Sequence, residues 1–148
     1  MLRMVLIAAV MAVGMSRLPG APVDGDTVTI VNSGSTNRAG FRITVDRSGN
    51  AVLTSTPRRF GAGQTAPEPV RQTLPADLVK SFFTDLAAAR PLGALPAVHC
   101  PRSASFGSVL TVALGEEQSP DLSCGDGGHA AMRDLIRDTN QIVALLLK

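Results

Sequence analysis

Alternating side chains in the first third of the chain constrain the fold more than any other feature of the sequence. Residues 27–31 (TVTIV) alternate hydroxyl and apolar side chains, and residues 41–46 (FRITVD) place every second apolar side chain on one face. This period of two is typical of strands with one buried face. Residues 46–50 (DRSGN) are typical of a turn, and residues 51–57 (AVLTSTP) resume the strand pattern. The three segments therefore predict an antiparallel meander.

Two later segments have the period of amphipathic helices. Residues 74–91 carry apolar side chains at helical spacing and end at a proline, which stops a helix. Residues 129–148 repeat the pattern, with an opposite face that carries Arg133, Asp134, Arg137, Asp138 and Gln141. We expect that charged face to be solvated.

The remaining strands are shorter. Residues 70–74 predict a short fourth strand, and residues 108–115 (SVLTVALG) predict a central strand with apolar side chains on both faces. We expect a hairpin partner strand after the EEQS turn, ending near Cys124. The order of elements predicts an α+β fold, an antiparallel sheet of about five to six strands with two helices packed on one face.

One face of this predicted sheet has no helix to cover it. Arg42 and Thr44 lie on that face in the second strand, and Thr54 and Thr56 lie on it in the third. We expect this open face to be the natural binding surface of the protein.

The first 20 residues have the layout of a secretory signal peptide. Arg3 precedes an apolar run of 12 residues, Met4 to Met15, whereas a bilayer-spanning helix needs roughly 18 to 20. We expect residues 1–20 to be removed and residues 21–148 to form a single exported domain. That domain would be secreted or periplasmic, with no membrane span after signal removal.

The charge of the exported part argues against nucleic acid as a partner. The chain has 14 basic and 12 acidic residues, and the predicted signal removes Arg3 and Arg17, so 12 of each sign remain. Binding to nucleic acid depends on a basic surface and on stacking aromatic side chains. The chain has neither Trp nor Tyr. Its Ala, Gly, Arg and Pro content is typical of a bacterial protein.

The chain has two cysteines, Cys100 and Cys124. In an exported chain they predict one disulfide, whose closed loop of about 25 residues would stabilise the fold by roughly 3.5 kcal/mol. The alternative is a metal site that also uses His99 and His129. Adjacent residues in an extended segment point to opposite faces, so His99 and Cys100 favour the disulfide over shared ligation. We expect no metal and no cofactor.

A hydrolase would need a serine, a base and an acid that the fold brings together. The candidate residues are Ser33, Ser35, Ser105, His99, His129 and Asp126. No GxSxG motif is present, and that motif supplies the strained turn on which such a serine is presented. We expect no catalytic activity, and a small Ser/His hydrolase is the alternative hypothesis.

Two hydroxyl-rich loops are candidate binding elements. They are residues 32–37 (NSGSTN) and residues 102–108 (RSASFGS), whose backbone N–H groups could receive an anion or a peptide carboxylate. The alternative is two turns in which Ser and Asn side chains bond their own backbone. The candidate binding residues are Asn32, Ser33, Ser35, Thr36, Asn37, Arg102, Ser103 and Ser105.

Five segments together resemble a group of small exported bacterial proteins that have no assigned activity. They are NSGSTN, FRITVDRSGNA, LPADLVKSFFTDLAAARPLGALP, CPRSASFG and SPDLSC. The resemblance covers most of residues 21–148 and implies export and a single domain, but it assigns no functional residue.

The sequence therefore leads to a hypothesis of a non-catalytic binding or inhibitor-like module. It would act through the sheet face and the polar loops on a protein, a peptide or an envelope component. A structural envelope protein without a specific ligand is the third hypothesis.

Overall fold

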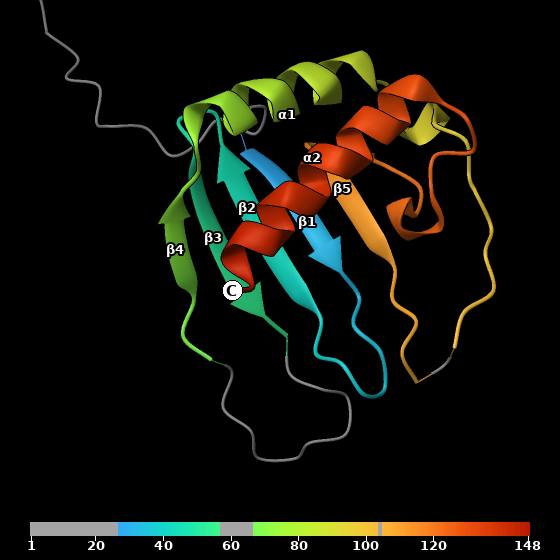
Figure 1. The fold of residues 1–148 in the computed structure, drawn as a ribbon, viewed down its shortest axis with the longest axis horizontal. Helices are drawn as coiled ribbons and strands as arrows, with labels where there is room; N and C mark the ends of the chain where they lie inside the picture. The colour runs from blue at the N-terminus through green and yellow to red at the C-terminus, as the bar shows by residue number, and fades with distance from the viewer. Residues whose placement is uncertain (1–26, 57–66, 104) are drawn as a thin grey trace, which may run out of the picture.

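Six antiparallel strands form one sheet in the computed structural model, which describes residues 27–56, 67–103 and 105–148 (Figure 1). The order across the sheet is β4-β3-β2-β1-β5-β6, and every neighbouring pair is antiparallel. The predicted signal peptide lies outside the described residues. The strands are β1 (Thr27–Asn32), β2 (Phe41–Asp46), β3 (Asn50–Ser55), β4 (Val70–Thr73), β5 (Leu110–Leu114) and β6 (Glu117–Gln118).

Two long helices cover one face of this sheet, as Figure 1 shows. They are α1 (Ala76–Ala88) and α2 (Ala130–Leu146), and the short 3-10 helices η1 (Leu92–Ala94) and η2 (Leu122–Cys124) lie in the connections. Pro75 precedes α1 and Asp77 lies in its first turn, both of which favour the start of a helix. Pro91 follows the end of α1, as the sequence predicts. The predicted α+β fold with an antiparallel sheet and two helices on one face is confirmed.

Helix α1 carries the chain from the β4 edge of the sheet toward β5, the strand next to the opposite edge. Its 13 residues span about 20 Å, and four strand spacings separate β4 from β5, which amounts to about 19 Å. Figure 1 shows α1 running from the end of β4 toward the side of β5. The chain can therefore return as β5 beside the first strand.

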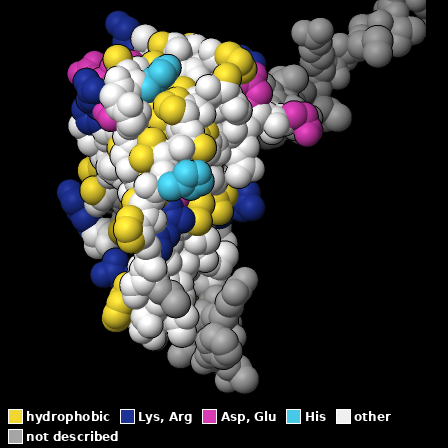
Figure 2. All heavy atoms as spheres, turned by 90° about the vertical axis from the view of Figure 1, so that its right-hand side faces the viewer, with side chains coloured by type: hydrophobic (Ala, Val, Ile, Leu, Met, Phe, Trp, Pro, Cys, Tyr) yellow, Lys and Arg dark blue, Asp and Glu magenta, His cyan; other side chains and the backbone are white. Residues whose placement is uncertain are grey.

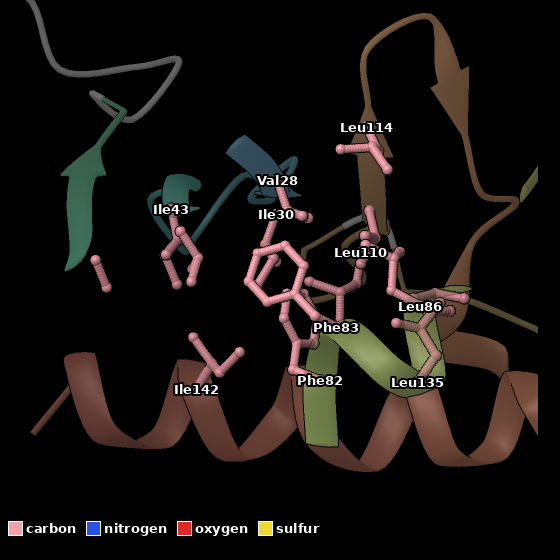
Figure 3. Close-up of a cluster of buried hydrophobic side chains, with 14 of the residues drawn as sticks. Val28, Ile30, Ile43, Phe82, Phe83, Leu86, Leu110, Leu114, Leu135 and Ile142 are labelled. Atoms are coloured by element: carbon pink, nitrogen blue, oxygen red, sulfur yellow. The ribbon is translucent and has the colours of Figure 1, made fainter. Parts of the chain in front are cut away.

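The hydrophobic core lies between the sheet and the two helices (Figure 3). Alternate residues of the central strands supply one wall, and the apolar stripes of α1 and α2 supply the other. Fully buried side chains from both walls include Ile30, Ile43, Val112, Phe82, Leu135 and Ile142.

The predicted partner strand of β5 after the EEQS turn is wrong in position and length. Strand β6 has only Glu117 and Gln118, inside that predicted turn, and the segment that leads to Cys124 forms η2 instead of a strand. Ser119 continues the pairing with Val112, since its N–H donates to the Val112 carbonyl (2.9 Å) and its hydroxyl accepts from the Val112 N–H (3.0 Å). Pro120 then follows, and proline has no N–H to extend a ladder.

The two edges of the sheet differ. All four residues of β4 are exposed along one edge, whereas the two-residue strand β6 forms the other.

The expectation of a fully solvated charged face on the last helix is wrong for Asp138, whose exposed fraction is 2%. Helix α1 packs against α2 at this position, and the Ser81 hydroxyl donates to Asp138 Oδ2 (2.6 Å). The Arg137 Nε group donates to Asp138 Oδ1 (2.9 Å). A carboxylate with two such partners is tolerated in a helix interface.

Within the residues that the structure describes, no helix is both long enough and apolar enough to cross a bilayer.

The core predicts a large difference between two phenylalanines. Phe82 is fully buried, so Phe82→Ala should lower the free energy of unfolding by about 3–5 kcal/mol. Phe106 is 60% exposed, and the matched variant Phe106→Ala should change it by less than about 0.5 kcal/mol. Urea unfolding followed by circular dichroism measures both values. Equal losses would contradict the assignment of the core.

Candidate functional site

The two predicted binding loops lie against each other. The Ser35 hydroxyl donates to the Ser105 carbonyl (2.9 Å), and the Asn37 N–H donates to the same carbonyl (3.1 Å). The loop that joins β1 to β2 therefore contacts the segment that leads into β5, although about 70 residues separate them in the sequence. The structure does bring the two loops together.

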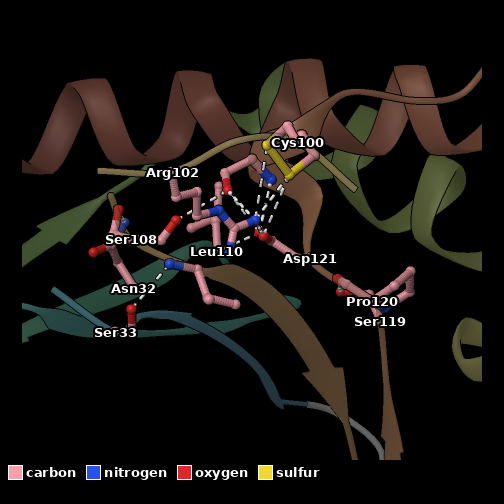
Figure 4. Close-up of polar contacts among 12 residues, drawn as sticks. Asn32, Ser33, Cys100, Arg102, Ser108, Leu110, Ser119, Pro120 and Asp121 are labelled. Atoms are coloured by element: carbon pink, nitrogen blue, oxygen red, sulfur yellow. Dashed lines mark hydrogen bonds and ion pairs between the residues drawn. A yellow bond between two sulfur atoms is a disulfide. The ribbon is translucent and has the colours of Figure 1, made fainter. Parts of the chain in front are cut away.

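Most polar groups of these loops are used in holding them together. The Ser33 N–H donates to the Val109 carbonyl (2.9 Å), and the Ser33 hydroxyl accepts from the Val109 N–H (2.9 Å). The Asn32 amide donates to the Ser108 hydroxyl (3.1 Å), and the Gly34 N–H donates to Asn32 Oδ1 (2.9 Å). Figure 4 shows Asn32 and Ser33 beside Ser108.

A further backbone donor of the first loop is also paired. The Ser35 N–H donates to the Arg38 carbonyl (2.9 Å), and Thr36 takes part in an interaction as well. Ser103 lies in the second loop, where its hydroxyl accepts from the Ser105 N–H (3.2 Å). An anion cradle needs N–H groups that point outward without a partner. This geometry instead closes the ends of β1 and β5.

The first loop follows a tight path that requires glycine at two positions. Gly34 has a φ of +65°, and a Cβ atom there would lie 2.4 Å from the Gly40 nitrogen. A Cβ atom on Gly40 would lie 2.5 Å from the Asn32 carbonyl oxygen. Only glycine fits at such approaches, so the loop has little room to rearrange around a ligand.

The two cysteines form the predicted disulfide. The sulfur atoms of Cys100 and Cys124 are bonded, and the Cα atoms are 5.4 Å apart, within the range for a bridge. Both sulfur atoms are therefore unavailable as thiolate ligands. No group of three or more His, Cys, Asp or Glu residues suited to a metal ion occurs among the described residues.

Arg102 lies beside this disulfide and not at an open rim (Figure 4). Its guanidinium forms an ion pair with Asp121, lies 2.8 Å from Cys124 Sγ and donates to the Ser123 hydroxyl (3.4 Å). The side chain is 30% exposed. Arg102 thus links the connection after η1 to the segment around η2.

Asp121 is the acceptor on which this region depends. Its Oδ1 atom accepts from the Leu110 N–H (3.0 Å), the Ser123 N–H (2.9 Å) and the Ser123 hydroxyl (2.7 Å). The sequence interpretation overlooked this role. The signal was present, since Asp followed two residues later by Ser is a pattern in which the carboxylate caps a short turn.

The histidines are placed apart from the loop serines. The His129 Nδ1 atom accepts from the Met132 N–H (3.3 Å) and caps α2. His99 lines a hollow of about 200 Å³ with Arg102 and Asp121. Figure 2 shows the two histidine side chains, in cyan, at separate places on this side of the molecule. Among the described residues, no hydrogen bond joins a histidine to Ser33, Ser35 or Ser105.

Asp126, the candidate acid, is also engaged elsewhere. Its carboxylate accepts from the Gly128 N–H (2.8 Å) and from Arg133 Nε (2.5 Å). These bonds, with the Gly128 N–H as the largest cause, hold the pKa of Asp126 below its usual value. The carboxylate is thus kept ionised at the start of α2.

The uncovered face of the sheet presents one continuous row of side chains across all six strands. The cross-strand register places Thr44 between Val52 and Thr29, and extends the row in both directions. In spatial order the row is Arg71, Val52, Thr44, Thr29, Ala113 and Gln118. A second row joins Thr54, Arg42, Val31 and Thr111.

The polar groups of these rows have no partner within the described residues. The two arginines, Arg42 and Arg71, form no ion pair there, and the threonine hydroxyls form no hydrogen bond. Asp46 lies on the same face at the end of β2 and accepts from the Asn50 N–H and side-chain amide (2.9 Å each). The Asn50 side-chain bond is the largest cause of the lowered pKa of Asp46. Thr56 continues from β3, and its N–H donates to the Gly40 carbonyl (2.9 Å).

Glu117 is another residue whose role the sequence did not indicate, because its pair with Glu116 was interpreted as a turn tip. Its carboxylate accepts from Arg90 and from the Leu92 N–H (3.0 Å), so it ties β6 to η1. The Arg90 hydrogen bond is the largest cause of the lowered pKa of Glu117. Glu116 itself is exposed.

No protein-family model matches the chain, and no curated protein matches it closely enough to count as a relative. The residues and their geometry are therefore the basis for assigning a function.

The contacts of Asp121 predict a graded loss of stability. Asp121→Ala leaves the Leu110 N–H without its acceptor and Arg102 without its ion pair, and should lower the free energy of unfolding by about 1–3 kcal/mol. Asp121→Asn keeps an oxygen acceptor and should cost less. Chemical unfolding with the disulfide intact gives both values. Two equal losses below about 0.5 kcal/mol would show that Asp121 is not needed.

The lowered pKa of Glu117 predicts a pH-dependent effect. A carboxylate with a lowered pKa in the folded state stabilises the fold above its unfolded pKa, and this stabilisation disappears as the pH falls through the folded pKa. Glu117→Gln should therefore lower the Tm more at pH 7 than at pH 3. The matched variant at the exposed neighbour, Glu116→Gln, should show no such change. A Tm difference independent of pH for Glu117→Gln would contradict the assigned ion pair.

Proposed function

We propose that this protein is an exported, non-catalytic binding module whose partner-contacting surface is the open face of the sheet. The single observation that carries the proposal is the row of outward side chains that crosses all six strands without a covering element among the described residues. The disulfide supports export, because such bonds persist in oxidising compartments such as the bacterial periplasm or the extracellular space.

The chemistry of the open face favours a protein partner with an acidic surface. Arg42 and Arg71 bring two positive charges. Asp46 lies beside these rows at the end of β2, and Asn50 engages its carboxylate. Val31 and Val52 add apolar area between hydroxyls that can donate hydrogen bonds. Sugars are a weaker fit, because they stack on aromatic side chains and these rows contain none.

The size of the face sets the expected affinity. Six strands span about 24 Å, and strands of six residues run about 20 Å, so the area is of the order of 500 Å². Stable interfaces bury about 800 Å² per partner. We therefore expect a transient complex with a micromolar dissociation constant, whose strength decreases with salt.

The proposal predicts that crosslinking depends on the face that carries the probe. A photo-crosslinking amino acid at Thr54, which is exposed on the open face, should capture a partner in the exporting cell. The same probe at Gln141, exposed on α2, should not capture it. With the purified partner, Arg42→Gln combined with Arg71→Gln should weaken binding at least tenfold, and Lys148→Gln should leave it unchanged.

Equal capture from both probe positions, or no reproducible capture from Thr54, would overturn the proposal. The second result would favour a structural protein without a specific ligand. Full affinity of the double arginine variant would also overturn it.

A further inference from the structure

Strand β4 forms one edge of the sheet, and no described element pairs with its outer side (Figure 1). All four of its residues are exposed. Its register with β3 places Val70 opposite Leu53 and Arg71 opposite Val52. An edge of this kind presents both side chains and backbone groups to other chains.

The outward backbone groups of β4 belong to Arg71 and Thr73. The Leu74 N–H donates to the Gly49 carbonyl on the β3 side (2.9 Å). Backbone groups in an antiparallel strand point alternately to its two sides, so those of Gln72 also point toward β3 and those of its two neighbours point away. Each outward residue has one N–H donor and one carbonyl acceptor. The edge therefore presents two donor–acceptor pairs in line.

Val70 is an apolar side chain that the fold leaves nearly half uncovered. Its partner Leu53 has an exposed fraction of 5%, whereas that of Val70 is 45%. Directly opposed residues of an antiparallel pair share a face, so Val70 belongs to the core side of the sheet. An apolar side chain on an added strand would cover it.

The charge at this edge is positive. Arg71 is the only charged residue of β3 and β4. A hollow of about 300 Å³ lies beside it, and no acidic residue is among the described residues that line this hollow. Glu68 precedes the strand, but Arg71 forms no ion pair with it or with any other described residue. The guanidinium can therefore bind a carboxylate through two parallel hydrogen bonds.

We propose that an extended acidic segment of the partner adds to this edge as a strand antiparallel to β4. A glutamate of the segment lies opposite Arg71 on the open face, and an apolar residue lies opposite Val70 on the core side. In strand addition, backbone hydrogen bonds supply affinity and alternate side chains supply specificity. The inference rests on the proposed function, because it describes how the acidic partner contacts one border of the open face.

A second copy of the chain is a weaker fit for the same edge. Two β4 strands related by a twofold axis would place both Arg71 side chains on one face of the joined sheets, where like charges on neighbouring strands are unfavourable. Pro69 precedes β4 and has no N–H with which to extend the pairing. The charge that disfavours a second copy thus favours an acidic segment.

The test uses a probe designed for this register, acetyl-Thr-Thr-Glu-Val-amide, titrated into the isotope-labelled protein. Its glutamate lies opposite Arg71 and its valine opposite Val70. Binding should shift the amide NMR signals of Arg71 and Thr73 and leave those of α2 unchanged. The matched probe acetyl-Thr-Thr-Lys-Val-amide should bind about tenfold more weakly, because its charge is reversed.

Methylation of the probe backbone separates strand addition from side-chain contact. In a hydrogen-bonded antiparallel pair, opposed residues exchange both backbone bonds. The N–H of the probe's glutamate therefore points toward β4, and that of its valine points away. N-methylation at the glutamate should abolish binding, whereas N-methylation at the valine should be tolerated. Because the change is in the probe, the fold of the protein is unaffected.

Matched variants test the role of the edge arginine. Arg71→Gln should weaken binding of the glutamate probe about tenfold. Arg42→Gln, on the same face but two strands away in β2, should leave this binding unchanged.

Three results would overturn the inference. They are equal binding of the lysine probe, equal effects of the two N-methylations, and a stable dimer of the purified protein whose interface maps to β4. Capture of a partner from Thr54 without binding of the glutamate probe would overturn strand addition and leave the proposed function in place. Binding of the probe without capture from Thr54 would contradict the proposed function alone.

Discussion

Burial of one face of the sheet under α1 and α2 is the constraint on which the rest of the structure depends. Side chains alternate along a strand, so a slip of one residue would move a whole apolar set into solvent. The full burial of Ile30 and Ile43 on neighbouring strands fixes their register. The same register fixes the opposite face, because the side chains at the alternate positions of each strand must point away from the core. The row through Thr29 and Thr44 is thus a consequence of the core.

A second constraint comes from returning the chain to the far edge of the sheet. After α1 has crossed the sheet, η1 is the only regular structure in the described part of the connection to β5. Such a segment has few ladder hydrogen bonds, so side chains and the disulfide supply its fixed points. Glu117 fixes η1 through the Leu92 N–H, and the disulfide from Cys100 to Cys124 fixes the middle of the connection. Asp121 fixes the start of β5 through the Leu110 N–H. The hydrogen bond between Ser33 and Val109 attaches the polar loops to the start of β5.

The fold could be predicted from the sequence because its signals are local. The alternation in residues 41–46 and the helical period in residues 74–91 give the elements directly, and two cysteines allow one intramolecular pairing. The contacts of polar side chains could not be predicted in the same way. Asp138 lies on the polar side of its helix by period, yet it is buried because Ser81 of α1 faces it.

The polar contacts of the candidate site could not be predicted from the sequence either. The sequence indicates the two hydroxyl-rich loops as candidate binding elements, but it does not reveal that they contact each other or which of their donors are already used. Ser35 bonds a backbone carbonyl 70 residues away, a contact that only the folded chain defines. A groove lined by Arg47, Lys80 and Phe83 was not predicted either, because these residues come from a turn and a helix that are far apart in the sequence. The Ser35 contact and the groove both depend on packing that exists only in the folded protein.

The unequal edges of the sheet bear on how the protein avoids self-association. An exposed edge strand offers unpaired backbone groups to other chains, and natural proteins counter this with short strands, charge and proline at the edge. Strand β6 offers only two residues. Strand β4 is longer, but Pro69 precedes it and the exposed Arg71 stands in its middle. Both edges of the sheet thus carry features that disfavour pairing with the edge of another sheet.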